Sequence, residues 1–172
     1  MTIKITPVSS ADEITLVEQL AEEIWSQHYS SIIGLLQVKY MIKTFQSFEA
    51  ISFQIQDGVE YYLVTINNRI VGYLSLVLDY PSKRLMLSKI YVKQLGRKKG
   101  VGKAMLDFVE EKCTEKGLDT LWLTVNRFND DAIIWYKNHG FNTVDEVKKD
   151  IGSGFFMDDY IMEKKIKTTS SS

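Results

Sequence analysis

The stretch Leu85–Lys103, LMLSKIYVKQLGRKKGVGK, joins an apolar segment, a basic loop with glycines and the start of a helix. Its first part, Leu85–Val92, is rich in residues that favour strands. From Val101 the apolar residues recur at helical spacing. A helix that begins directly after such a loop presents unpaired backbone N–H groups and the positive end of its dipole. The pattern is therefore typical of a strand, a loop suited to binding phosphate, and a helix.

The length and the charge balance restrict the class of protein. The chain has 172 residues, which favours one domain, and we expect it over residues 1–166, with a polar flexible tail over 167–172. The 21 basic residues against 22 acidic ones disfavour a nucleic-acid partner, because general binding to nucleic acid needs a basic excess. One cysteine, Cys113, excludes an intrachain disulfide. No signal peptide or membrane-spanning run is found, so we expect a cytoplasmic protein without a membrane partner.

Strand and helix patterns alternate along the chain. We expect strands over 2–6, 60–66, 69–78, 84–92, 119–125, 141–149 and 155–165, and helices over 11–29, 35–45, 47–58, 100–116 and 129–140. Ser10 and Glu13 form a capping-box pattern, and Asn67–Asn68 is typical of a tight turn. This order predicts a single α/β domain whose central sheet is mixed and flanked by helices on both faces.

The basic loop has a functional and a structural interpretation. Gly100 and Gly102 allow the backbone to approach a ligand closely. Phosphate is also favoured by four basic residues, Arg97, Lys98, Lys99 and Lys103. An ordinary strand-to-helix turn with a solvated basic face explains the glycine spacing about equally well. A GxxxxGK sequence followed by Ser or Thr, and a complete GxGxxG, are both absent from the sequence.

Two motifs together resemble the GNAT (Gcn5-related N-acetyltransferase) superfamily. The first is Arg97-x-x-Gly100-x-Gly102 directly after Lys89-Ile90-Tyr91-Val92. The second is Leu123-Thr124-Val125 followed by Asn129, Ala132, Tyr136 and Gly140-Phe141. The sequence departs from the usual pattern at Lys98, where glycine is common, and at Gln94, where proline is frequent.

The resemblance implies a GNAT-like fold, with a mostly antiparallel sheet of about seven strands, and acetyl-CoA as the acyl donor without a metal. The loop amides would hold the CoA pyrophosphate, and the strand before them would pair with the pantetheine arm. The donor-binding residues that it implies are Ile90, Tyr91, Val92, Arg97, Lys98, Lys99, Gly100, Val101, Gly102, Lys103 and Asn129.

The resemblance assigns Tyr136 as the general acid, since a phenol can protonate the thiolate that leaves the thioester. The structural alternatives are a helix N-cap for Asn129 and a half-buried core aromatic for Tyr136. No acidic residue lies within Leu85–Val92, where the family often has its base, and Ser88 could at most order a water there. Other candidates are more distant, so we name no base: Glu22, Glu23, His28 and Asp79.

The acceptor is expected to be a primary amine, with a small amine or a polyamine favoured. Trp25, Tyr29 and Tyr40 predict an aromatic wall that can hold an ammonium group, although core packing explains such spacing as well. Asp158 and Asp159 either bind a second ammonium group or form a turn. The alternative function is a non-catalytic acyl-CoA-binding sensor or scaffold. The oligomeric state is left open, with a homodimer as one option.

Overall fold

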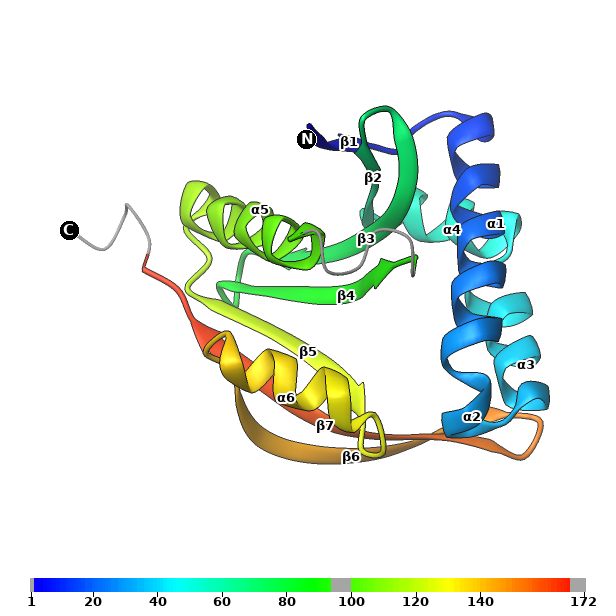
Figure 1. Ribbon diagram of the computed structural model, residues 1–172. Helices are drawn as coiled ribbons and strands as arrows, with labels where there is room; N and C mark the ends of the chain where they lie inside the picture. Colours follow the sequence, from blue (N-terminus) through cyan, green and yellow to red (C-terminus); the bar gives the residue numbers. More distant parts are fainter. Residues whose placement is uncertain (1, 94–99, 168–172) are drawn as a thin grey trace. The chain divides into compact units, whose positions relative to one another are not determined.

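The computed structural model describes residues 2–93 and 100–167 (Figure 1). Arg97, Lys98, Lys99 and the expected tail beyond Lys167 lie outside the described residues. The helices are α1 (Ala11–His28), α2 (Ser30–Ile33), α3 (Leu35–Phe45), α4 (Phe48–Gln56), α5 (Val101–Lys116) and α6 (Asp130–Asn138). The strands are β1 (Ile3–Pro7), β2 (Glu60–Ile66), β3 (Arg69–Asp79), β4 (Arg84–Val92), β5 (Thr120–Asn126), β6 (Asn142–Gly152) and β7 (Phe155–Lys165).

In the described part of the chain, seven strands form one sheet in the order β1-β2-β3-β4-β5-β7-β6. The pairs β1–β2, β2–β3, β5–β7 and β6–β7 are antiparallel. The pair β4–β5 is parallel, with Leu85 opposite Leu121. The predicted fold class, a mixed and mostly antiparallel sheet with helices, is confirmed.

The chain packs as two compact units. The first comprises Met1–Val77 and Lys89–Val109, and the second comprises Leu78–Ser88 and Glu110–Ser172. The strands β3 and β4 and the helix α5 contribute residues to both units. The single domain expected over residues 1–166 stays a prediction.

In the first unit, helices cover both faces of the sheet. Side chains alternate along β2, so Tyr61 and Tyr62 point to opposite faces. On one face Tyr61 stacks with Tyr73, which accepts a hydrogen bond from Trp25 of α1. On the other face the ring of Tyr62 meets Phe108 of α5, with 5.0 Å between the ring centroids. Both faces are therefore removed from water, which stabilises the sheet.

A chain of buried hydrogen bonds joins the helices of the first unit to β2 and β3. Trp25 Nε1 donates to the Tyr73 hydroxyl at 3.2 Å, and that hydroxyl donates to Gln46 Oε1 at 2.7 Å. Gln46 Nε2 donates to the Tyr61 hydroxyl at 3.0 Å, and Tyr61 donates to Gln54 Oε1. Burial raises the pKa of Tyr73 well above its ordinary value. Because each of these polar groups has a partner, the network holds α1, α3 and α4 on the sheet at little cost.

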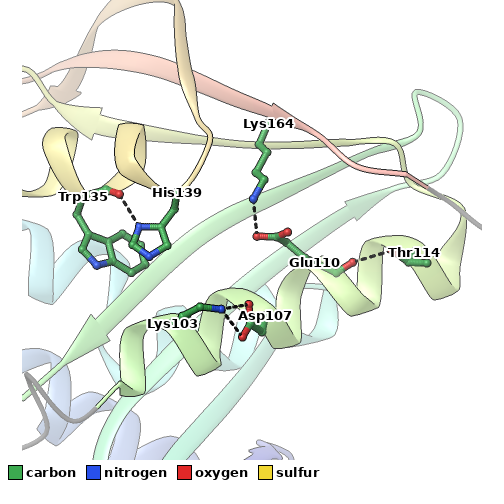
Figure 2. Close-up of polar contacts among 7 residues, drawn as sticks. All are labelled: Lys103, Asp107, Glu110, Thr114, Trp135, His139 and Lys164. Carbon is green, nitrogen blue, oxygen red and sulfur yellow. Dashed lines mark hydrogen bonds and ion pairs between the residues drawn. The ribbon is translucent and has the colours of Figure 1, made fainter.

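In the second unit, β5 is covered on one face by apolar packing. Leu121, Leu123 and Val125 alternate along β5 and are buried. An ion pair links α5 to β7: Lys164 Nζ lies 3.0 Å from Glu110 Oε2 (Figure 2). Burial raises the pKa of the Cys113 thiol on α5 to about 12, as expected for a structural cysteine rather than a nucleophile.

Candidate active site

The start of α5 keeps the features that favour phosphate. Gly100 has a φ of +73°, a conformation that side chains other than glycine rarely adopt. The first helical hydrogen bond runs from Ala104 N to Gly100 O at 3.0 Å, so the amides before Ala104 lie at the open end of the helix. Lys103 forms an ion pair with Asp107 at 3.0 Å (Figure 2). Both side chains are well exposed, so this pair is weak and can open for a ligand.

Gly72 of β3 lies directly against the backbone of β4. A Cβ atom on Gly72 would lie 2.3 Å from the carbonyl oxygen of Tyr91 and 3.3 Å from Val92 Cα. The next backbone bond, from Lys93 N to Val71 O, is 2.7 Å long. Only glycine fits at this point without moving one of the strands. Gly72 stands outside both sequence motifs, and its only sign in the sequence is a glycine inside a strand, which is typical of close backbone approach.

Four aromatic side chains from α1, the residue after it, β3 and β4 cluster in the first unit. The ring of Tyr91 lies 5.3 Å from Trp25, 5.7 Å from Tyr29 and 5.4 Å from Tyr73, between centroids. Trp25 is only 4% exposed and Tyr73 is fully buried, so these two are core residues. Tyr29 and Tyr91 are half-buried and form the accessible part of the cluster. The predicted residue Tyr40 is half-buried on α3.

The remaining predicted residues of β4 are Ser88, Ile90 and Val92, which are all half-buried. Burial lowers the pKa of the neighbouring Lys89 to about 8. Val101 is buried at the start of α5 and Gly102 is half-buried. The second half of β4, from Ser88 to Val92, thus presents side chains that are neither in the core nor fully in water.

Asn129 takes the N-cap position of α6, as expected, but its side chain makes no capping hydrogen bond. The interpretation of this side chain as a cap is therefore wrong. Asn126 holds the preceding turn instead, because its Oδ1 accepts from Phe128 N at 2.9 Å. Asn129 is nevertheless only 5% exposed. The buried side-chain amide of Asn129 is thus not engaged as a cap of α6.

Tyr136 is half-buried on α6, two helical turns after Asn129. Its ring makes edge contacts with Trp135 and Phe141, each at 5.4 Å between centroids. The end of α6 is held by His139, whose Nδ1 lies 2.7 Å from the carbonyl oxygen of Trp135 and whose ring stacks on that side chain (Figure 2). These contacts fix the position of the Tyr136 ring on its helix.

Asp158 and Asp159 lie within β7, so the alternative that they form a turn is wrong. They point to opposite faces of the strand. Asp158 accepts from Arg127 Nε at 2.8 Å. Asp159 is 5% exposed, and burial, followed by the charge of Asp158, raises its pKa to about 6, against a hydrogen bond from Thr124. Asp159 is therefore the carboxyl group of this pair that lacks an ion pair within the described residues.

Two further properties concern the described residues as a whole. Residues 2–93 and 100–167 contain no group of three or more His, Cys, Asp or Glu side chains that is able to hold a metal ion. Over the same ranges, every helix is too short or too polar to cross a membrane.

Comparison with known proteins identifies the family. The model of the acetyltransferase (GNAT) family matches residues 17–141. A curated relative, an uncharacterized N-acetyltransferase in the pepI 3' region of Lactobacillus delbrueckii subsp. lactis, is 28% identical over 95 residues. That match covers 52% of this chain and 55% of the relative, so the chain spans about half the length of the curated relative.

Solved structures show the same fold. The PaiA N-acetyltransferase of Thermoplasma acidophilum, in complex with coenzyme A, is 24% identical with a TM-score of 0.79, over 96% of this chain and 99% of that one. A GNAT acetyltransferase of Staphylococcus aureus Mu50 is 23% identical with a TM-score of 0.71, over 96% and 100%. The ribosomal-protein-S18-alanine N-acetyltransferase of Escherichia coli is 18% identical with a TM-score of 0.71, over 99% and 98%. The family predicted from the two motifs is confirmed: the chain belongs to the acetyltransferase (GNAT) family, whose acyl donor is acetyl-CoA.

Proposed function

We propose that this protein is an N-acetyltransferase that moves the acetyl group of acetyl-CoA to a primary amine by direct attack in a ternary complex. The observation that carries the proposal is the start of α5, where Gly100 at positive φ opens a helix directly after a basic loop. The family model spans both this junction and Tyr136. A helix start of this kind suits the phosphates of CoA.

The donor would be held by backbone groups and by charge. The amides of Val101, Gly102 and Lys103 at the open end of α5 suit the pyrophosphate. The basic side chains of Arg97, Lys98 and Lys99, outside the described residues, would add to this attraction. The edge of β4 over Ile90, Tyr91 and Val92 would run along the pantetheine arm, and Asn129 supplies a buried amide.

The reaction forms a C–N bond between the amine and the thioester carbon and breaks the C–S bond. The leaving sulfur then needs a proton, and the Tyr136 hydroxyl is the group that we assign to donate it. The attacking amine loses a proton to solvent, and the Tyr136 phenolate regains one from solvent, so the protons balance. Backbone N–H groups near Tyr91 would polarise the acetyl carbonyl. We assign no side chain as the base.

A small amine or a polyamine is the favoured acceptor. The half-buried rings of Tyr29 and Tyr91 suit an ammonium group, because cations are attracted to aromatic faces. Tyr40 and Trp25 would support this wall, and Ser88 would order a water. Asp159 is a buried carboxyl group without an ion pair in the described residues, and it suits a second ammonium group. Asp158 does not, because Arg127 already neutralises it.

The test is the release of free thiol from acetyl-CoA in the presence of a panel of amines, with acetyl-CoA binding measured by calorimetry on the same preparation. We expect amine-dependent thiol release that is fastest with small amines or polyamines. Binding of acetyl-CoA without acceleration by any amine would instead favour a non-catalytic acyl-CoA-binding protein. That second function is kept because no acidic residue lies on β4. A cytoplasmic location stays a prediction.

A further inference from the structure

The strand β6 is a long, exposed edge. It ends the strand order of the sheet and pairs with β7 alone within the described residues. It is 11 residues long, and its first nine residues, Asn142–Asp150, are all exposed. Edge strands are usually short or covered, because their free N–H and C=O groups are a template for another strand. We propose that two copies of this chain pair through β6, antiparallel, around a two-fold axis at Val147.

The outward-facing backbone groups of β6 can be identified from one hydrogen bond. Glu146 N donates to the side chain of Asp145 at 2.8 Å, so this N–H is not donated to β7. Backbone groups alternate in direction along an antiparallel strand, so Lys148 also presents its N–H and C=O outward. By the same alternation, Asp145, Val147 and Lys149 direct their backbone groups toward β7, where their partners are Ile161, Asp159 and Met157.

These directions restrict the register of a symmetric pair. Outward residues must lie opposite outward residues, so a two-fold axis passes through a residue and not between two residues. An axis at Asp145 or Lys149 would set that charged side chain against its own copy, which leaves Glu146, Val147 and Lys148. An axis at Glu146 sets the two glutamates against each other. An axis at Lys148 opposes the two lysines and places Glu146 opposite the partner's Asp150. Both registers bring like charges together, which is unfavourable.

An axis at Val147 pairs opposite charges at each position. Glu146 lies opposite the partner's Lys148, and Asp145 lies opposite the partner's Lys149, with the same pairs repeated by symmetry. Val147, which is 36% exposed, meets its own copy at the axis. The segment Asp-Glu-Val-Lys-Lys is thus self-complementary when it is read in opposite directions. A strand that carries charges of only one sign at its edge would repel a second copy, whereas this segment carries both signs.

The existing contacts of these side chains allow the pairing. Glu146 is held by Arg127 at 3.2 Å, and the ammonium group of Lys148 lies 5.1 Å from the ring centre of Phe156. Both contacts are on one face of the hairpin and leave the outer edge open. In the dimer, the side chain of Asp145 would release the amide of Glu146, and this amide would donate to the partner's Lys148 carbonyl. The carboxylate of Asp145 would pair with the partner's Lys149.

Sedimentation velocity of the full chain over a concentration series tests the pairing. We expect a dimer for the wild type, and at least about tenfold weaker dimerisation for Lys148→Glu/Lys149→Glu and for Asp145→Lys/Glu146→Lys. A mixture of the two variants should dimerise again, because the charges become complementary. A matched control is Lys116→Glu/Lys137→Glu, which makes the same charge change at exposed residues away from β6.

Circular dichroism checks that each variant is folded before its mass is measured. Three results would overturn the proposal: a wild type that stays monomeric, a dimer that both charge-reversed variants keep, and variants that do not recover when mixed. The outcome does not depend on the acetyltransferase activity, so failure here leaves the proposed function untouched.

Discussion

The junction of β4 with α5 and the aromatic cluster of α1 lie in the same unit, yet they are defined in different ways. At the junction, the backbone defines the local structure. Gly100, at positive φ, directly precedes α5, and Gly72 leaves room for the backbone of Tyr91. In the aromatic cluster, side chains from three elements meet, and Tyr29 is set by its neighbours. Gly100 is recognisable from the short motif of the basic loop, whereas Gly72 is not. A region that is defined by packing becomes visible only after folding.

The contrast between backbone and side chains extends to α6 and β7, where single side chains are assigned roles in the proposed reaction.

The largest effect is expected for Tyr136→Phe, which removes one oxygen and keeps the ring contacts with Trp135 and Phe141. Turnover should fall by about 10²–10⁴-fold, as for loss of a general acid. The affinity for acetyl-CoA, measured by calorimetry, should stay within about twofold, because the Tyr136 hydroxyl is assigned a role only in protonating the leaving sulfur. Unchanged turnover would remove Tyr136 from the mechanism.

Gly72→Ala tests whether the backbone approach is essential. The new Cβ would lie 2.3 Å from the Tyr91 carbonyl oxygen, so the strands must separate there. We expect a loss of about 1–3 kcal/mol in the free energy of unfolding, the usual cost of overpacking, and weaker binding of acetyl-CoA. Urea unfolding and calorimetry measure the two effects.

Gly154→Ala is the control, because the Cβ position of Gly154 has open space around it, and any cost there comes from its positive φ of +80°, a conformation that Gly72 does not have. It should cost about 1–2 kcal/mol through its φ alone and leave acetyl-CoA binding unchanged. Equal effects of the two substitutions on acetyl-CoA binding would show that the contact with Tyr91 is unimportant.

Asp159→Asn tests the buried carboxyl group through its pH dependence. The pKa of Asp159 is raised from 3.8 to about 6, so ionisation costs more in the folded state than in the unfolded chain. This penalty is absent below about pH 4, develops as the pH rises, and is complete above pH 6. The variant should therefore be more stable than the wild type by about 1–3 kcal/mol at neutral pH, with the difference vanishing in acid.

Thermal unfolding across this pH range measures the effect. Asp158→Asn is a second test: it breaks the ion pair with Arg127, and it removes a charge that raises the pKa of Asp159, so the pH dependence due to Asp159 should move to lower pH in that variant. A stability difference for Asp159→Asn that does not change with pH would contradict the raised pKa.

Tyr29→Ala should have the smallest effect of this set. The side chain is half-buried, and its removal takes one ring from the proposed acceptor wall. We expect the KM for the amine to rise by about tenfold or less, as for loss of one cation–π contact, with binding of acetyl-CoA unchanged. Steady-state kinetics with varied amine separates the two. A change confined to acetyl-CoA would assign Tyr29 to the donor instead of the acceptor.

Local patterns predicted much of the fold. Periodicity and caps defined α3 and β4 with the bounds that the structure has, and the capping box of Ser10 and Glu13 is complete, with bonds of 3.2 Å and 2.9 Å. These features depend on residues that are close in sequence. The separate helix α2 was not expected, because its four residues are too few for a periodic pattern.

The parts that sequence reasoning missed depend on distant residues. Gly72 is important only because Tyr91 lies beside it, and Gln46 only because two tyrosines reach it. Asp159 differs from Asp158 through its face of β7 and the position of Arg127. The expected side-chain cap at Asn129 is absent, and Asn126 instead accepts a hydrogen bond from Phe128 N in that turn. Residue type and spacing predict such roles poorly when the neighbours come from other elements.

The most direct test of the account is product formation by the wild-type protein. The chain is incubated with acetyl-CoA and the best amine of the panel, and mass spectrometry follows the amine while a thiol reagent follows CoA. The account predicts an amine that is heavier by one acetyl group, with one thiol released for each amide formed. Tight binding of acetyl-CoA with no acetylated amine in any class of acceptor would contradict it.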